Sequence, residues 1–515
     1  MLDANSQPLT GQSSLIDSVE RYRRTLLFGS LGFTPAQIRA AGGGATRFTI
    51  ASGTPGLSRS QMDAGLFFED TWRVRPNLTV AHGLRCEWQT NLSDRGDFAP
   101  RLSAAWAPGR GARRKTVLRA GFGVFYDRFA LANTLTVDRY DGVVQQQFAV
   151  ANPDSYPLPP SLASSGAQSG TIVERLASDL RSTYLLQSAV TLERQVSKGV
   201  TAAFTYTNSR GLHLLRTRDV NAPLPGTYDP NVSGSGAYPL GRSSPLFLIE
   251  SSGRYNQNQF IANANVKLKS SLSMFAFYAF NHASSDTDGV NTSPANPYSY
   301  AGEYSRASTD VRHRITAGGS VNLRWNIRVS PFVILQSGVP FNITTGADTY
   351  GTTLFNARPG IAANSSKTGL VRTKYGLLDP NPTPGETLIA RNAGSGPAQM
   401  TVNPRLAKTI GFGPERSGSS GGGAAASAAP SASPMPTGGS LRSLIGTPSA
   451  PRRYNLILSL SARNVLKHND PGPIVGNITS SLFGRSNQVA AGPNGEGFSE
   501  NASNRRLEVQ IRLTF

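Results

Sequence analysis

The last residues of the chain, 505–515 (RRLEVQIRLTF), alternate between apolar and polar side chains without interruption. The apolar ones share one face of an extended strand and are Leu507, Val509, Ile511, Leu513 and Phe515. A tilted strand of about eleven residues is long enough to cross a bilayer. A soluble sheet that packs one face on a core gives the same alternation. The pattern therefore predicts a strand with one apolar face and leaves both environments open.

The same alternation recurs along the chain and predicts about thirteen strands. In residues 65–74 (GLFFEDTWRV), for example, Leu66, Phe68, Trp72 and Val74 share one face. The other predicted strands cover residues 78–88, 101–107, 116–129, 183–195, 200–208, 258–268, 272–281, 312–324, 327–336, 401–411, 454–465 and the terminal strand.

The connections between these strands alternate in length. The short ones are 75–77, 196–199, 269–271 and 325–326, and the long ones are 130–182, 209–257, 282–311, 337–400 and 466–502. Outer-membrane barrels have short periplasmic turns and long extracellular loops, whereas a soluble sandwich gives no reason for such sorting. The chain is therefore predicted to be all-β: a transmembrane antiparallel up-and-down β-barrel whose last strand ends in the periplasm.

The same alternation of short and long connections assigns residues 1–61 to an extracellular loop, with short helices at 14–27 and 34–41. Thr34 and Pro35 are residues typical of a helix start. Residues 62–515 are then the barrel, interrupted by 414–451, whose Gly, Ser, Ala and Pro predict a disordered insertion. A domain linker is the alternative, less favoured because a strand resumes directly at Tyr454.

The odd tally of strands predicts an open, partial barrel. Bacterial single-chain barrels have even numbers of strands and close to remove their edges. We therefore expect the barrel to close only with further strands upstream. The first residues, MLDANSQPLTGQ, also lack the pattern of a signal peptide.

Composition narrows the class of protein. Only 16% of the residues are charged, and no apolar run approaches the roughly 18 residues of a membrane helix. The single cysteine, Cys86, excludes an intrachain disulfide and a cysteine-rich metal site. The net charge of +20 comes mostly from scattered arginines, which argues against nucleic-acid binding and suits a surface coated with anionic lipopolysaccharide.

Eight ordered segments resemble the C-terminal barrel of Oar-like TonB-dependent outer-membrane receptors. They are LFFEDTWRVRPNLTVAHGLRCE, FAPRLSAAWAPGRGARRKTVLRAGFGVFYDRF, TYTNSRGLHLLRTRDVNAPLPG, STDVRHRITAGGSV, ILQSGVPFNIT, TLFNARPG, RYNLILSLSARNVLKHND and NRRLEVQIRLTF. The resemblance covers nearly the whole chain apart from 414–451. It implies location in the cell outer membrane and uptake of a large, unidentified substrate.

The resemblance also implies partners. They are outer-membrane lipid and lipopolysaccharide, the barrel-assembly machinery, and the TonB complex through a plug and TonB box expected upstream of this chain. Phe515, with Leu513 and Ile511, resembles the C-terminal signal that the assembly machinery recognises.

No motif of an enzyme, cofactor site or metal site is present, so none is predicted. The five histidines are dispersed and are interpreted as solvated or strand residues. Asp310, Arg312 and Arg314 are expected on one strand face, either as a salt-bridged ladder lining the lumen or as substrate contacts. The carboxylates of Asp286, Asp288 and Asp348 suit a hard cation such as Ca²⁺, although exposure to solvent is the simpler interpretation.

Three functions remain open from the sequence. The first is the barrel of a TonB-dependent transporter, and the second is a surface adhesion or structural barrel that transports nothing. A soluble basic β protein that binds polyanions is ranked below both.

Overall fold

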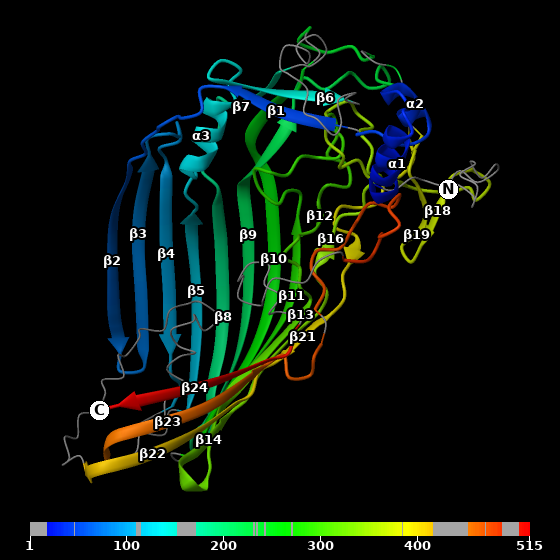
Figure 1. Cartoon of the computed structure of the whole chain (residues 1–515). Coiled ribbons are helices and arrows are strands. Elements are labelled where there is room, and N and C mark those ends of the chain that lie inside the picture. The colour runs from blue at the N-terminus through cyan, green and yellow to red at the C-terminus, as the bar shows by residue number, and fades with distance from the viewer. Residues whose placement is uncertain are drawn as a thin grey trace.

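A computed structural model describes residues 18–45, 47–109, 115–151, 171–229, 232, 235–241, 244–268, 271–383, 385–415, 452–468, 470–486 and 504–515. Its main feature is one large, mostly antiparallel sheet that curves into an open wall (Figure 1). No helix in the described part of the chain is long and apolar enough to cross a membrane.

Every predicted strand has a counterpart in the wall, which confirms the expected fold class. The wall strands follow the chain in order: β2 (Asp63–Arg75), β3 (Leu78–Gln89), β4 (Asp97–Trp106), β5 (Thr116–Tyr126), β8 (Tyr184–Ser197), β9 (Val200–Asp219), β10 (Leu246–Leu268), β11 (Leu272–Ser285), β13 (His313–Asn322), β14 (Ile327–Ser330) with β15 (Phe332–Gln336), β21 (Gln399–Val402) with β22 (Arg405–Glu415), β23 (Arg452–Arg463) and β24 (Arg506–Thr514). Among the described residues, β2 pairs only with β3 and β24 only with β23, so the barrel is not closed.

Away from the edge strands β2 and β24, which are exposed along nearly their whole length, the two faces of the wall differ in burial. Leu406 and Leu460 stand in one row of the register on the face that we call the outer face, and they are 47% and 43% exposed. On the opposite, inner face, polar Ser209 and Ser459 are buried. A water-soluble sheet packs its apolar face on a core and solvates the other. This wall does the reverse, as a sheet in lipid does.

Short and long connections lie at opposite ends of the wall, as expected (Figure 1). The β8–β9 turn depends on Gly199, whose φ is +83°. A Cβ at this position would lie 2.1 Å from the carbonyl oxygen of Lys267, so no other residue fits without a shift of the backbone. The turn after β13 is the short helix η2 (Arg324–Asn326).

The long connections contain more structure than the sequence predicts. β1 (Arg47–Gly53) pairs with β6 (Gln145–Ala151), and β7 (Thr171–Leu176) joins β6 to β10. Helices α1 (Ser18–Ser30), α2 (Pro35–Ala40) and α3 (Leu131–Arg139) lie at the same end (Figure 1). The Thr34 side chain caps α2, as predicted. Helix α1 ends three residues beyond its prediction, and residues 14–17 lie outside the described residues.

The predicted loop 209–257 was too long. β9 continues to Asp219 and β10 begins at Leu246, so residues 209–219 and 246–257 belong to a tall hairpin. Alternation fails there because residues of both kinds are buried, such as Arg216 and Ile249 at 1% exposure each. The predicted insertion at 414–451 stays a prediction, since 416–451 lie outside the described residues and β22 runs to Glu415.

Smaller strands order the remaining loops. They are β12 (Ser305–Arg306), β16 (Pro340–Phe341), β17 (Gly360–Ile361), β18 (Val371–Thr373), β19 (Gly376–Asp379) and β20 (Gly394–Ser395). A buried cluster of Ile343, Leu378, Ile389 and Ile478 packs residues from the loops before β21 and after β23 against each other. We call this end of the molecule the loop layer.

Candidate functional site in the loop layer

Ion pairs with buried arginines join the loop that follows β11 to β9 and to the loop that precedes β21. Their members come from four segments of the chain and are Arg216, Asp286, Asp288, Glu303, Arg358 and Arg391. We call them the loop network.

Arg391 reaches from the loop before β21 into the loop after β11. It is 2% exposed and donates hydrogen bonds to the carbonyl oxygens of Glu303 (3.1 Å) and Ser285. Its third partner is the carboxylate of Asp288. A single guanidinium thus fixes three points of the neighbouring loop, because its donors form a rigid planar fork.

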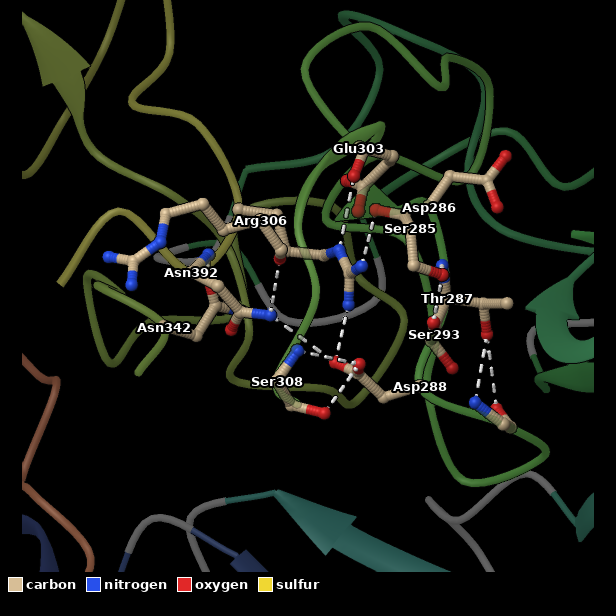
Figure 2. Close-up of polar contacts among 12 residues, drawn as sticks. Ser285, Asp286, Thr287, Asp288, Ser293, Glu303, Arg306, Ser308, Asn342 and Asn392 are labelled. Carbon is tan, nitrogen blue, oxygen red and sulfur yellow. Dashed lines mark hydrogen bonds and ion pairs between the residues drawn. The ribbon is translucent and has the colours of Figure 1, made fainter. Parts of the chain in front are cut away.

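The Asp288 carboxylate is a junction in the same network. Figure 2 shows Ser308 beside it, which donates from its hydroxyl at 2.8 Å and from its backbone N–H at 3.2 Å. Asn392 also lies beside it and donates at 3.0 Å to the carbonyl oxygen of Arg306. Asp288 therefore connects both ends of its own loop to the loop before β21.

Arg358 forms a second buried pair, with Glu303 at 2.7 Å. It also donates to the carbonyl oxygens of Gly302 (2.7 Å) and Ile389 (3.0 Å). Burial lowers the pKa of the Arg358 guanidinium, while the Glu303 carboxylate opposes that shift. Glu303 in turn accepts a hydrogen bond from the backbone N–H of Ala295 at 3.0 Å. Glu303 therefore also holds two parts of its own loop together.

A third pair ties this loop to the tall hairpin. Arg216 of β9 lies 2.9 Å from Asp286, and its guanidinium carbon lies 4.4 Å from the ring centre of Tyr300. The Tyr300 hydroxyl donates to Glu250 of β10 at 2.5 Å, and Arg218 pairs with the same carboxylate at 3.1 Å. Burial and the nearby Glu250 carboxylate raise the pKa of Tyr300 to about 12.

These pairs make the loop layer rigid. Removing one partner of a buried pair leaves an uncompensated charge and typically costs about 3–5 kcal/mol. A rigid surface binds a ligand with little loss of conformational entropy. The arrangement therefore suits recognition at the mouth of the wall.

Asp348 orders the loop before β21 without an arginine. Its carboxylate accepts the backbone N–H groups of Thr352 (3.0 Å) and Thr353 (2.7 Å). Burial raises the pKa of this carboxyl group, and the backbone hydrogen bonds only partly oppose that effect.

The three aspartates considered for a cation have other roles. Asp286 and Asp288 are paired with Arg216 and Arg391, and Asp348 binds backbone N–H groups. Among the described residues, no group of three or more His, Cys, Asp or Glu side chains is arranged so that it could hold a metal ion. Asp286 is 8% exposed, so simple exposure to solvent does not describe it either.

The structure brings two of the predicted lumen residues together and separates the third. Asp310 is fully buried and accepts from Arg312 at 2.9 Å and from Arg306 at 3.0 Å. Arg314 instead donates to Gln336 of β15 at 2.9 Å, on the inner face.

The expected shared strand face is not formed, because β13 begins only at His313. Arg312 precedes the strand and turns toward His282, whose Nδ1 lies 2.5 Å from its guanidinium. The Phe280 ring, on the outer face, lies 6.0 Å from the same guanidinium. The salt bridge between Asp310 and Arg312 is present, but it is not a ladder that includes Arg314.

The terminal residues singled out by sequence lie on the outer face. Ile511 and Leu513 are opposite Leu458 and Leu456 of β23, and they are 69% and 55% exposed. Phe515 follows the end of β24 and is 86% exposed. An exposed C-terminal aromatic is accessible to a partner.

The loop network itself was missed from the sequence. Arg358, Glu303 and Arg391 are separated by dozens of residues and belong to no local motif. Arg358 and Arg216 fall in segments noted for the resemblance, TLFNARPG and TYTNSRGLHLLRTRDVNAPLPG, but no pairing partner was assigned to either. Their pairing depends on how two long loops pack, which periodicity does not encode.

Comparison with protein families gives one match. The family described as "Outer membrane beta barrel domain" matches residues 92–419. Comparison with curated proteins finds no match.

Solved outer-membrane proteins resemble the structure. The outer membrane transporter YddB from Escherichia coli is 12% identical with a TM-score of 0.48, over 88% of this chain and 45% of its own. The siderophore receptor PirA from Acinetobacter baumannii is 9% identical with a TM-score of 0.46, over 88% and 46%. The FrpB iron transporter from Neisseria meningitidis (F3-3 variant) is 9% identical with a TM-score of 0.41, over 88% and 45%. The chain spans less than half the length of each.

Proposed function

The chain belongs to the outer membrane beta-barrel domain family, and from this premise we propose that it is part of the barrel wall of a TonB-dependent transporter. Its location is the outer membrane. The observation that carries the proposal is the reversed burial of the wall, with Leu460 exposed at 43% on the outer face and Ser459 buried on the inner face. Such a wall separates lipid from a polar interior through which a substrate can pass.

The transporter is proposed to be of the Oar-like type, because eight ordered sequence segments resemble those receptors. Strands beyond the described sheet would pair with β2 and β24 and close the barrel, since an open sheet edge in lipid leaves backbone groups without hydrogen bonds. Energy would come from the TonB complex acting on a plug outside this chain. We expect no enzymatic activity and no cofactor.

Phe515 is proposed to act in assembly, because it is exposed immediately after the last strand. Replacing it by aspartate should reduce the amount of protein inserted by the barrel-assembly machinery. The heat-modifiable fraction on gels measures insertion. Equal insertion of the Phe515→Asp variant and the native protein would contradict a role of Phe515 in assembly.

A surface adhesion barrel is the second candidate, because the rigid loop layer would present a binding surface equally well without transport. Uptake measurements on cells that carry the complete gene separate the two functions. Substrate accumulation that stops when a protonophore collapses the proton-motive force supports transport. Binding to cells with no accumulation would support adhesion.

A further inference from the structure

The outer face of the wall changes from aromatic to polar along β9, β10 and β11, which lie side by side (Figure 1). One row of the register is aromatic, with exposed fractions of 50%, 41% and 40%, and consists of Tyr206, Phe260 and Phe280. The next row toward the loops is polar and consists of Asn208, Asn258 and His282. Aromatic side chains collect where lipid meets water. The edge of the hydrocarbon layer is therefore expected between these two rows.

Contacts between neighbouring strands hold both rows in place. The Tyr206 hydroxyl donates to Oδ1 of Asn258 at 2.7 Å, and the Asn208 amide donates to the same oxygen at 2.9 Å. The ring centre of Phe280 lies 5.3 Å from that of His313 on β13. The boundary thus continues across four neighbouring strands.

Two exposed arginines stand just beyond the polar row on the same outer face. Arg210 lies two residues beyond Asn208 on β9, and Arg254 lies four residues beyond Asn258 on β10. The register places Arg210 opposite Asn256, so the two arginines are diagonal neighbours. Their positions are about 7 and 13 Å along the strands from the polar row, and strand tilt reduces the height. Both guanidinium groups can therefore reach the lipid head groups.

No carboxylate neutralises these two arginines in the described part of the chain. Neither guanidinium forms an ion pair or a hydrogen bond there. β9, β10 and β11 contain two carboxylates, Asp219 and Glu250. Asp219 is 4% exposed, and Glu250 pairs with Arg218 at 3.1 Å. The two arginines therefore offer their full charge to a ligand.

A third cation lies beside the polar row. Arg306 and Arg312 share the carboxylate of Asp310, at 3.0 and 2.9 Å, so this group carries one excess positive charge. The Arg312 guanidinium also lies 2.5 Å from Nδ1 of His282 and 6.0 Å from the Phe280 ring centre. These contacts fix it at the boundary, on the same surface as the other two arginines.

The arrangement fits a lipid that carries more than one phosphate group. Guanidinium groups bind phosphate through paired hydrogen bonds. The three cations stand on β9, on β10 and before β13, so they can hold separate phosphates. Acyl chains below such a head group would cover the exposed aromatic row, which a soluble anion would leave bare. A common phospholipid has a single phosphate, whereas the lipid A part of lipopolysaccharide has two.

From this arrangement we infer that Arg210, Arg254 and Arg312 bind the phosphate groups of lipid A, with its acyl chains against the aromatic row. Lipopolysaccharide occupies the leaflet that faces the cell exterior, and the loop end of the proposed barrel faces the same way. The inference rests on this orientation and goes beyond the proposed function, because lipid binding is measured without a substrate.

The test is binding of diphosphoryl lipid A, monophosphoryl lipid A and phosphatidylglycerol to the full-length chain in detergent micelles, measured by native mass spectrometry. Diphosphoryl lipid A should bind most tightly. Arg210→Gln and Arg254→Gln should each weaken its binding roughly fivefold, because each removes one cation from an anionic lipid contact. The matched control is Arg194→Gln, which removes an exposed outer-face arginine of β8 at the opposite end of the wall and should leave binding unchanged.

Arg210→Lys guards against a folding artefact, because it keeps the charge. It should recover most of the binding that Arg210→Gln loses, while all variants keep native heat-modifiable mobility on gels. The inference is overturned if lipid A does not bind, if phosphatidylglycerol binds as tightly, or if Arg194→Gln loses as much affinity as the other glutamine variants. Energised uptake without lipid A binding would also overturn this site and leave the proposed transport standing.

Discussion

Buried arginines set the geometry of the loop layer at the scale of single residues. Arg391 and Arg358 each pair with a carboxylate and donate to backbone carbonyl oxygens of another segment. Buried pairs of this kind favour one arrangement of the loops, because another arrangement would leave a buried arginine without its carboxylate.

The first prediction concerns Arg358. Replacing it by methionine leaves the buried Glu303 carboxylate, whose side chain is 3% exposed, without its cation and should lower the free energy of local opening of the loops around residues 286–308 by about 3–5 kcal/mol. Hydrogen exchange of the amides in this segment measures the change. The matched control is Arg463→Met, because its pair with Glu508 is 47% and 45% exposed and should contribute under about 1 kcal/mol. Equal effects of the two substitutions would contradict the role of burial.

The second prediction is a pH dependence at Asp348. Its pKa is raised in the folded loop, so the folded form holds a proton at pH values where the open loop has lost it. Loop stability should therefore be greatest below the ordinary pKa of an aspartate and should fall as pH rises through the raised pKa. Protection of the Thr352 and Thr353 amides, corrected for intrinsic exchange rates, reports this trend. Asp348→Asn should abolish the dependence, and an unchanged slope in that variant would refute its assignment to Asp348.

The sequence predicted least at the scale of single residues. Asp310 and Arg312 were paired correctly, but their spacing from Arg314 suggested one strand face where the strand starts only at His313. Arg216 and Arg391 could not be found at all, because a buried arginine and a solvated one look alike in sequence. Their identity as network residues depends on packing between distant loops.

Strands were the most predictable elements, because each keeps one face apolar over most of its length. β24 shows the pattern most clearly, with Leu507, Val509 and Ile511 on the outer face and Glu508 and Gln510 on the inner one. Prediction failed where both faces are covered, as in the upper halves of β9 and β10, and for β1, β6 and β7 in the loop layer. Apolar and polar residues alternate only where the two faces of a strand meet different environments. Where both faces are buried, the alternation is lost and the strand cannot be predicted from it.

The third prediction separates the two faces of β24. Ile511→Arg places a charge on the lipid face, at a cost of about 2–4 kcal/mol near the bilayer centre. Gln510→Arg places the same charge on the inner face and should be tolerated. The insertion yield and the heat-modifiable fraction on gels measure the difference. Equal tolerance of both substitutions would argue that β24 does not face lipid.

The whole molecule is an open wall of antiparallel strands with a rigid layer of loops at one end (Figure 1). The wall accounts for location in the outer membrane, and in the proposed transporter the loop layer would supply the surface that a substrate meets first. Alternation and the sorting of connection lengths were enough to predict this architecture. The interlocking of the loops was not, because it depends on pairs far apart in sequence.

The central claim is that the outer face of the wall meets lipid and the inner face does not. A fluorophore on the single cysteine tests it, since Cys86 shares the outer face with Leu66 and Phe98. In a Cys86→Ala background, single cysteines replace Val509, Gln510, Ile511 and Arg512 in turn, and each labelled protein is reconstituted with nitroxide-bearing lipids. We predict strong quenching at 86, 509 and 511 and weak quenching at 510 and 512. Uniform quenching along 509–512, or none at any position, would contradict the account.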